Sequence, residues 1–153
     1  MQGEWPFNGA TVEVVARSGC DLNPVDPTTE DGRLTLLSFT WPDLHARLAQ
    51  LAAAIEMAKT VPAKVERAEA TEWLARQLTE PRPGTATIVF HSIVLVYMSP
   101  EARSRFEETL AEAGARATQD APLAWVSMER GPGGERRLIS RAGFHGAQVT
   151  LIS

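Results

Sequence analysis

Two adjacent polar residues, His91 and Ser92, interrupt a run that is otherwise apolar. A histidine near the end of a buried strand can donate, accept or transfer a proton close to neutral pH. A serine beside it suggests a hydrolase, but no Gly-x-Ser-x-Gly turn exposes this hydroxyl as a nucleophile. We therefore predict His91, with Ser92, as the catalytic or site-lining pair; the alternative is a hydrogen-bonded core histidine.

A second group of polar residues lies in the loop-like stretch 20–32, where Asp21, Asn23 and Asp26 occur among prolines and a glycine. Carboxylate and amide oxygens in such a loop can bind ribose hydroxyls or a cation. The same residue types also form Asx turns that merely hold a loop in shape. Both interpretations remain open for Asp21 and Asn23.

The residues that most often bind transition metals show no ligand spacing, so the sequence predicts no metal site. They are Cys20, His45, His91 and His145.

The elements that would position these groups alternate in type along the chain. Strands are predicted over 11–17, 63–67, 88–98, 123–129, 136–141 and 147–152. Helices are predicted over 33–39, from 44 until Pro62, and over 69–78 and 100–113. This alternation is typical of an α/β domain with a mostly parallel sheet and right-handed crossovers, to which the last strands add an antiparallel edge.

The strand predicted over 88–98 organises this arrangement, because its nearly continuous apolar character is typical of a strand covered on both faces. The helix after it has a clear start. Ser99 can cap the free N–H groups, Pro100 suits the first helical position, and Glu101 faces the positive helix end. Gly114 is the predicted stop.

Composition limits the class of protein. The 153 residues are 44% hydrophobic, enough for one ordinary domain over 1–153, and the net charge is −4. An acidic chain without a basic cluster argues against nucleic-acid binding. A single cysteine suits the cytoplasm, and the longest apolar run is too short to cross a membrane. The N-terminus has neither the basic nor the apolar region of a signal peptide.

Several sequence blocks together resemble the C-terminal half of a bacterial family, domain of unknown function 2332. These blocks are residues 17–26, 41–42, 90–97, 122–125 and 145–146. The resemblance runs over nearly the whole chain and implies no established activity.

The order of the blocks also resembles class I S-adenosylmethionine-dependent methyltransferases from their second strand onward. This resemblance implies a Rossmann-like three-layer fold in which Asp21 grips the ribose and Glu69 faces the adenine. His91 and Ser92 fall where the fourth strand meets the substrate. The first strand and its glycine loop have no counterpart in this chain, so the ligand cradle is incomplete.

Two interpretations of function follow. The chain is either a catalytically empty Rossmann-like module with a binding or assembly role, or half of an S-adenosylmethionine-dependent methyltransferase completed by a partner chain or a second copy. The absent glycine loop favours the first, and the missing strand predicts self-association. Trp41 and Tyr97 are the candidates for lining a substrate; Trp41, like Trp73 and Trp125, also suits a core position, which we favour.

Overall fold

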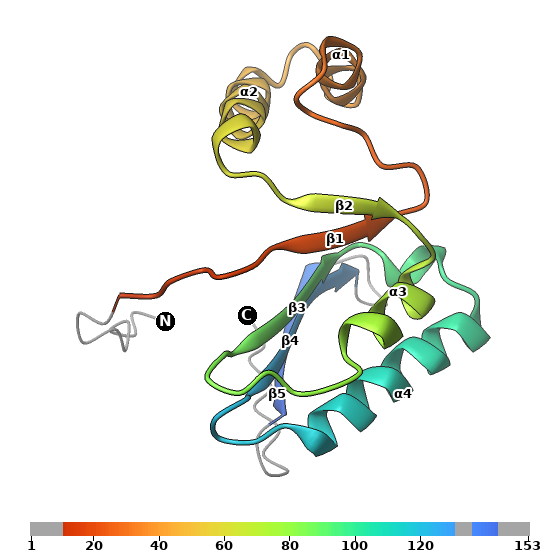
Figure 1. The fold of residues 1–153 in the computed structure, drawn as a ribbon. Coiled ribbons are helices and arrows are strands. Elements are labelled where there is room, and N and C mark those ends of the chain that lie inside the picture. Colours follow the sequence, from red (N-terminus) through yellow and green to blue (C-terminus); the bar gives the residue numbers. More distant parts are fainter. Residues whose placement is uncertain (1–10, 131–135, 144–153) are drawn as a thin grey trace, which may run out of the picture. The chain divides into compact units, whose positions relative to one another are not determined.

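The computed structural model describes residues 11–130 and 136–143 and shows a mixed α/β structure (Figure 1). The chain divides into two compact units, residues 1–67 and 68–153, and each is described by itself. The predicted α/β class, with parallel strand pairs and an antiparallel C-terminal strand, is confirmed. The single domain predicted over 1–153 stays a prediction.

The first unit is a pair of short parallel strands joined through two helices. The strands are β1 (Ser18–Asp21) and β2 (Lys64–Arg67), which pair from Ser18↔Lys64 to Asp21↔Arg67. Between them lie α1 (Glu30–Ser38) and α2 (His45–Thr60). A parallel pair needs such a crossover because its strands run in the same direction.

Local hydrogen bonds determine where α1 begins. Thr29 is the N-cap, and its Oγ1 accepts a hydrogen bond from the Gly32 backbone N–H at 3.0 Å. Gly32 is buried against the preceding loop, where a Cβ atom would lie 1.8 Å from the carbonyl oxygen of Asp26. Only glycine therefore allows this close approach between the loop and the helix.

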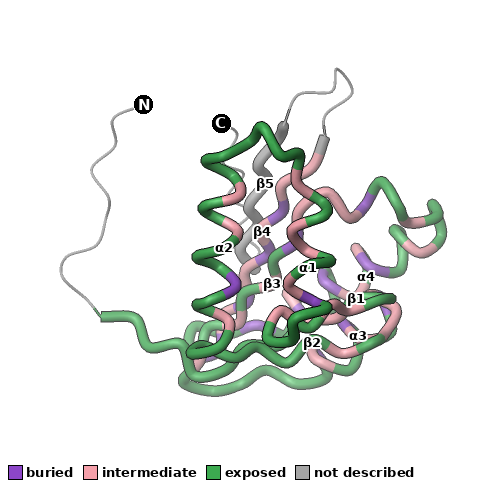
Figure 2. The backbone as a smooth tube through the Cα atoms, turned by 90° about the horizontal axis from the view of Figure 1, so that it is seen from above, coloured by how far each residue is buried: buried purple, intermediate pink, exposed green. Residues whose placement is uncertain are grey.

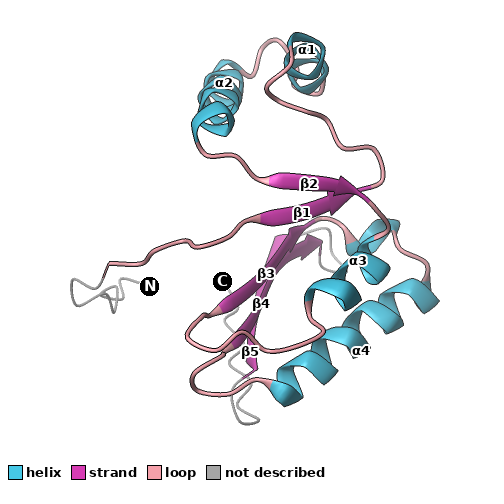
Figure 3. Ribbon diagram, in the orientation of Figure 1, coloured by secondary structure: helices cyan, strands magenta, loops and turns pink. Residues whose placement is uncertain are grey.

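The second unit is a three-stranded sheet with two helices. Its elements are α3 (Ala70–Gln77), β3 (Thr87–Ser92), a 3₁₀ turn η1 (Leu95–Tyr97), α4 (Pro100–Arg116), β4 (Leu123–Arg130) and β5 (Arg136–Gly143). The strand order is β3-β4-β5. β3 and β4 are parallel, and β4 and β5 are antiparallel (Figure 3).

The core of the second unit lies between one face of this sheet and the helices α3 and α4. Figure 2 shows the buried positions concentrated along these elements. The cluster combines residues from all of them: Leu74, Leu78, Leu95, Phe106, Leu110, Ala113, Ala117, Leu123 and Trp125. Its helical members recur at the spacing of one helix face, as the sequence predicts for 100–113.

The central-strand prediction over 88–98 is wrong in two respects. β3 ends at Ser92, and the chain turns into η1 at Leu95. The strand is also not covered on both faces, because the side chains of Ile88 and Phe90 are 66% and 65% exposed. Its other face, with Val89 and His91, does meet the core.

Other boundaries also differ from the prediction. Residues 11–17 form no strand, and β1 begins at Ser18 instead. α4 continues through Gly114 to Arg116, because a glycine within a helix costs only about 1 kcal/mol. The predicted strand over 136–141 is confirmed as part of β5. The predicted turn over 131–134 and strand over 147–152 lie outside the described residues.

The three tryptophans predicted for the core have different environments. Trp125 is buried, as predicted. Trp73 is half-buried and lies outside the core cluster. Trp41 is 75% exposed, so the prediction that it belongs to a core is wrong.

Candidate functional site

His91 lies near the C-terminal end of β3, on the face that meets the core. Its ring packs against two aromatic side chains. Phe106 of α4 approaches edge-on with ring centroids 5.5 Å apart, and Trp125 of β4 lies at 5.8 Å. The imidazole is therefore enclosed by the sheet on one side and by α4 on the other.

Hydrogen bonds fix the tautomer of this histidine. The indole Nε1–H of Trp125 donates to His91 Nε2 at 2.9 Å, and His91 Nδ1 lies 2.9 Å from Oε1 of Glu129. An indole nitrogen can only donate, so Nε2 must accept and Nδ1 carries the proton. His91 therefore donates to Glu129, and both of its ring nitrogens are engaged.

Burial keeps this imidazole neutral. The side chains of His91 and Glu129 are 8% and 13% exposed. Desolvation lowers the pKa of His91 below its ordinary value, although the charge and the hydrogen bond of Glu129 act in the opposite direction. Protonation would also place a hydrogen on Nε2, where it would face the N–H of Trp125 and replace a hydrogen bond by a repulsive contact. The hydrogen-bond geometry and the lowered pKa of His91 therefore both favour the neutral form.

Glu129 also binds the turn that follows β3. Its Oε1 accepts hydrogen bonds from the backbone N–H groups of Val94 at 3.0 Å and Leu95 at 3.3 Å. The turn passes through Ile93 at a φ of 54°, which is strained for a β-branched residue. Backbone N–H groups converging in such a turn form an anion-binding nest, and here the anion is the carboxylate of the protein itself.

This arrangement is suited to holding the end of β3 rather than to moving protons. A general base needs a free lone pair, and the Nε2 lone pair of His91 is used by Trp125. Ser92 is half-buried and points to the opposite side of the strand from His91, because side chains alternate. The catalytic pair His91 and Ser92 stays a prediction that requires one of these hydrogen bonds to break.

The predicted ribose-binding loop is held by its own turns. Oδ1 of Asp21 accepts from the Asn23 backbone N–H at 2.7 Å, an Asx turn. Oδ1 of Asp26 accepts from both the hydroxyl and the backbone N–H of Thr28, and these two bonds lower the Asp26 pKa. Asp21 is exposed as the last residue of β1. A role of Asp21 and Asn23 in cofactor binding stays a prediction.

Glu69, the other predicted cofactor residue, is the N-cap of α3. Its carboxylate accepts from the Glu72 backbone N–H at 3.0 Å and from the Thr71 hydroxyl at 3.1 Å. Partial burial by itself raises the pKa of Glu69, but the hydrogen bonds from Thr71 and Glu72 outweigh it and leave the pKa below its ordinary value. The carboxylate thus has a defined local role, and its contact with an adenine stays a prediction.

The predicted site residues fall in both units. Asp21, Asn23 and the exposed Trp41 belong to the first; Glu69, His91, Ser92 and Tyr97 belong to the second. Tyr97 is 85% exposed. Sequence reasoning missed Glu129, the partner of His91. An acid at the end of an otherwise apolar strand, β4, was the available signal.

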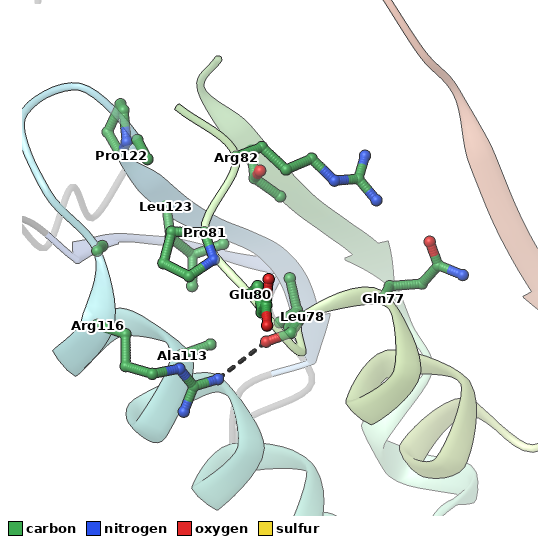
Figure 4. Close-up of a pocket in the computed structure, with 12 residues that line it drawn as sticks. Gln77, Leu78, Glu80, Pro81, Arg82, Ala113, Arg116, Pro122 and Leu123 are labelled. Carbon is green, nitrogen blue, oxygen red and sulfur yellow. Dashed lines mark hydrogen bonds between the residues drawn. The ribbon is translucent and has the colours of Figure 1, made fainter. Parts of the chain in front are cut away.

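Described residues of the second unit line two of the hollows in the structure, and His91 lines neither of these two. The first, at the starts of β3 and β4, has a volume of about 20 Å³, close to the space of one water molecule. Figure 4 shows Arg116 at its rim, where Nη2 donates to the Leu78 carbonyl oxygen at 2.9 Å. The second is an open groove of about 470 Å³ between α3 and α4. The charged residues that line it are mostly acidic: Glu69, Glu72, Glu108 and Glu112, beside the basic Arg105.

Among residues 11–130 and 136–143, no three His, Cys, Asp or Glu side chains gather closely enough to hold a metal ion. The helices in this part of the chain include none with the length and apolarity needed to cross a membrane.

Comparison with known proteins identifies the family. The model of a family described as uncharacterised protein conserved in bacteria (DUF2332) matches residues 1–151. The chain belongs to this family. No curated protein and no solved structure matches the sequence. For this DUF2332 chain, the match therefore identifies a bacterial family without attaching an activity to any residue of the site.

Proposed function

We propose that this DUF2332 chain is a Rossmann-like module with a binding or assembly role, and that it does not catalyse a reaction by itself. The state of His91 carries the proposal. The best candidate for a catalytic group in the chain is neutral, and it is hydrogen-bonded at both ring nitrogens by Trp125 and Glu129. A side chain held in this way contributes to stability and positioning rather than to proton transfer.

The strand connections support the Rossmann-like part of the proposal. β1 and β2 are parallel and joined through helices, and β3 and β4 are parallel and joined through α4. Crossovers of this kind build the three-layer α/β folds. The sequence contains no glycine-rich loop opening a helix, the usual source of N–H groups for a phosphate or carboxylate ligand. A cradle built by this chain alone would therefore be incomplete.

A methyltransferase half-site, completed by a partner chain or a second copy, is the second candidate. The position of one acid favours it. Asp21 is the last residue of β1 and is exposed, as the resemblance requires of an acid that grips ribose hydroxyls. In both candidates the chain acts in the cytoplasm, for which the single cysteine is the support.

Calorimetric titration of the purified chain with S-adenosylhomocysteine tests the proposal. We expect no heat of binding. Binding tighter than about 100 μM, which corresponds to roughly 5 kcal/mol, would contradict the proposal and support the second candidate if Asp21→Ala abolished it. The matched control is Asp31→Ala, which removes another exposed carboxylate of the same unit.

A further inference from the structure

β3 presents an open backbone edge. The Thr87 N–H donates to the Pro122 carbonyl oxygen and the Ile93 N–H to that of Met128, both at 2.8 Å. Backbone groups in a strand alternate sides, so Ile88, Phe90 and Ser92 direct their N–H and C=O groups away from β4. β4 is the only strand paired with β3 in the part of the chain that the structure describes, and Figure 3 shows β3 at the margin of its sheet.

The same strand exposes apolar side chains. Ile88 and Phe90 are 66% and 65% exposed, on the face opposite the core. An open strand edge beside exposed apolar side chains is a template for pairing with another strand. Proteins usually protect such edges with charges, and β2 follows this rule with Lys64, Glu66 and Arg67. β3 does not, because no Asp, Glu, Lys or Arg occurs between residues 83 and 100.

We propose that β3 pairs with β3 of a second copy of this chain, antiparallel and about a two-fold axis at Phe90. In this register Phe90 faces Phe90 of the other copy, and Ile88 faces Ser92. Each residue whose backbone points to the open edge then meets another such residue, so their N–H and C=O groups are all paired. Ile88, Phe90 and Ser92 are every second residue of the strand, so their side chains lie on the same face of the sheet. The apolar side chains of both copies therefore form one continuous face.

Charge favours a second copy as the occupant. Two identical strands usually repel each other if they carry a charged side chain near the axis, because that charge meets its own copy. β3 contains no such charge, and its histidine is buried and neutral. The strand is therefore compatible with itself, and an isologous two-fold contact is the commonest symmetry of soluble oligomers.

The area available indicates a reversible dimer. Two Ile88 and two Phe90 side chains, each about two-thirds exposed, can bury on the order of 500 Å². Stable interfaces bury about 1,200 Å² or more. The dimer should therefore be weak, forming at high concentration and dissociating on dilution. A second copy of the chain would be the partner in the assembly role proposed above, and the dimer therefore rests on that proposed function.

Sedimentation velocity over a wide range of concentrations, from about 1 to 500 μM, tests the dimer. We expect the wild-type chain to shift from monomer to dimer with concentration. Phe90→Lys should raise the dissociation constant at least tenfold, because two lysines would face each other at the axis. Met57→Lys is the control, since Met57 is equally exposed (63%) but lies on α2, and it should dimerise like the wild type.

A charge-swap mixture separates a lost interface from a misfolded variant. Phe90→Glu should also be monomeric, and an equimolar mixture of Phe90→Lys and Phe90→Glu should recover a dimer because lysine then faces glutamate. A wild-type chain that stays monomeric at every concentration would overturn the inference, as would a dimer insensitive to Phe90→Lys. Neither result would produce S-adenosylhomocysteine binding, so the proposed function is tested separately by calorimetry.

Discussion

Each of the two units contains two α-helices among its described residues, but the units differ in how many side chains they bury. In residues 68–130, α3, α4 and one face of the sheet enclose a continuous apolar cluster centred on Phe106 and Trp125. In residues 11–67, only Gly32 and Ile55 are buried, and Phe39 and Trp41 are 73% and 75% exposed. The helices of the first unit therefore bury few side chains, whereas a core requires side chains from distant segments to meet.

Phe106→Ala should have the largest effect on this comparison. Removing a fully buried phenylalanine costs about 3–5 kcal/mol, and Phe106 is 4% exposed. Phe39→Ala, the matched change in the first unit, should leave the free energy of unfolding nearly unchanged. Denaturant unfolding followed by circular dichroism measures both. Equal losses in the two variants would show that the first unit buries Phe39 in solution.

Gly32→Ala should be the most damaging single change in the first unit. The new Cβ atom would lie 1.8 Å from the Asp26 carbonyl oxygen, so the loop or the helix must move. We expect a loss of about 1–3 kcal/mol, typical of overpacking. Gly19→Ala is the control, because its Cβ would lie 4.0 Å from the nearest atom, on Val65. Hydrogen exchange should show lost protection in α1 for the first variant alone.

Stability of the second unit should fall when the pH drops below about 6.5, the ordinary pKa of histidine. The pKa of His91 is lower in the folded chain, so the unfolded chain binds the proton first and protonation favours unfolding. The slope can reach about 1.4 kcal/mol per pH unit. The pKa of Glu69 is also lowered, but this carboxyl group changes the stability only near pH 4, where ordinary carboxyl groups titrate.

Urea unfolding at a series of pH values between 5 and 8 measures this slope. His91→Gln should remove it, and His45→Gln, which changes an exposed histidine of α2, should keep it. A wild-type slope that survives His91→Gln would show that His91 is not the group responsible.

Loss of a helix cap should have the smallest effect on the free energy of unfolding. The effect should spread further in the second unit than in the first. Ser99 caps α4 through the Ala102 N–H, and Thr29 caps α1 through the Gly32 N–H. Each change to alanine should cost about 1 kcal/mol. We expect Ser99→Ala to lower the stability of the whole second unit, because α4 carries much of its core. Thr29→Ala should affect hydrogen exchange in α1 alone; a loss that spread to β4 would contradict this expectation.

Two helix starts could be predicted from the sequence, whereas α1 begins at Glu30 and not at the predicted residue 33. The Ser99-Pro100-Glu101 start is confirmed, as is the position of Glu69 at the beginning of α3. These features depend on hydrogen bonds between residues a few positions apart, which a sequence shows directly. The Asx turns of the 20–32 loop are confirmed for the same reason. The role of Asp21 in binding stays a prediction, because a turn shows how a carboxylate is held and not what it binds.

Contacts between distant segments determine which faces of the strands are buried and which hydrogen bonds His91 makes. The apolar run over 88–98 predicted cover on both faces, but only the contacts of α3 and α4 decide which face is covered. Glu129 lies 38 positions from His91, and the parallel register of β3 and β4 brings them together. Such pairings depend on strand register and crossover geometry, which no local pattern encodes. The physical reason is that the chemistry of a side chain is set by its neighbours in space.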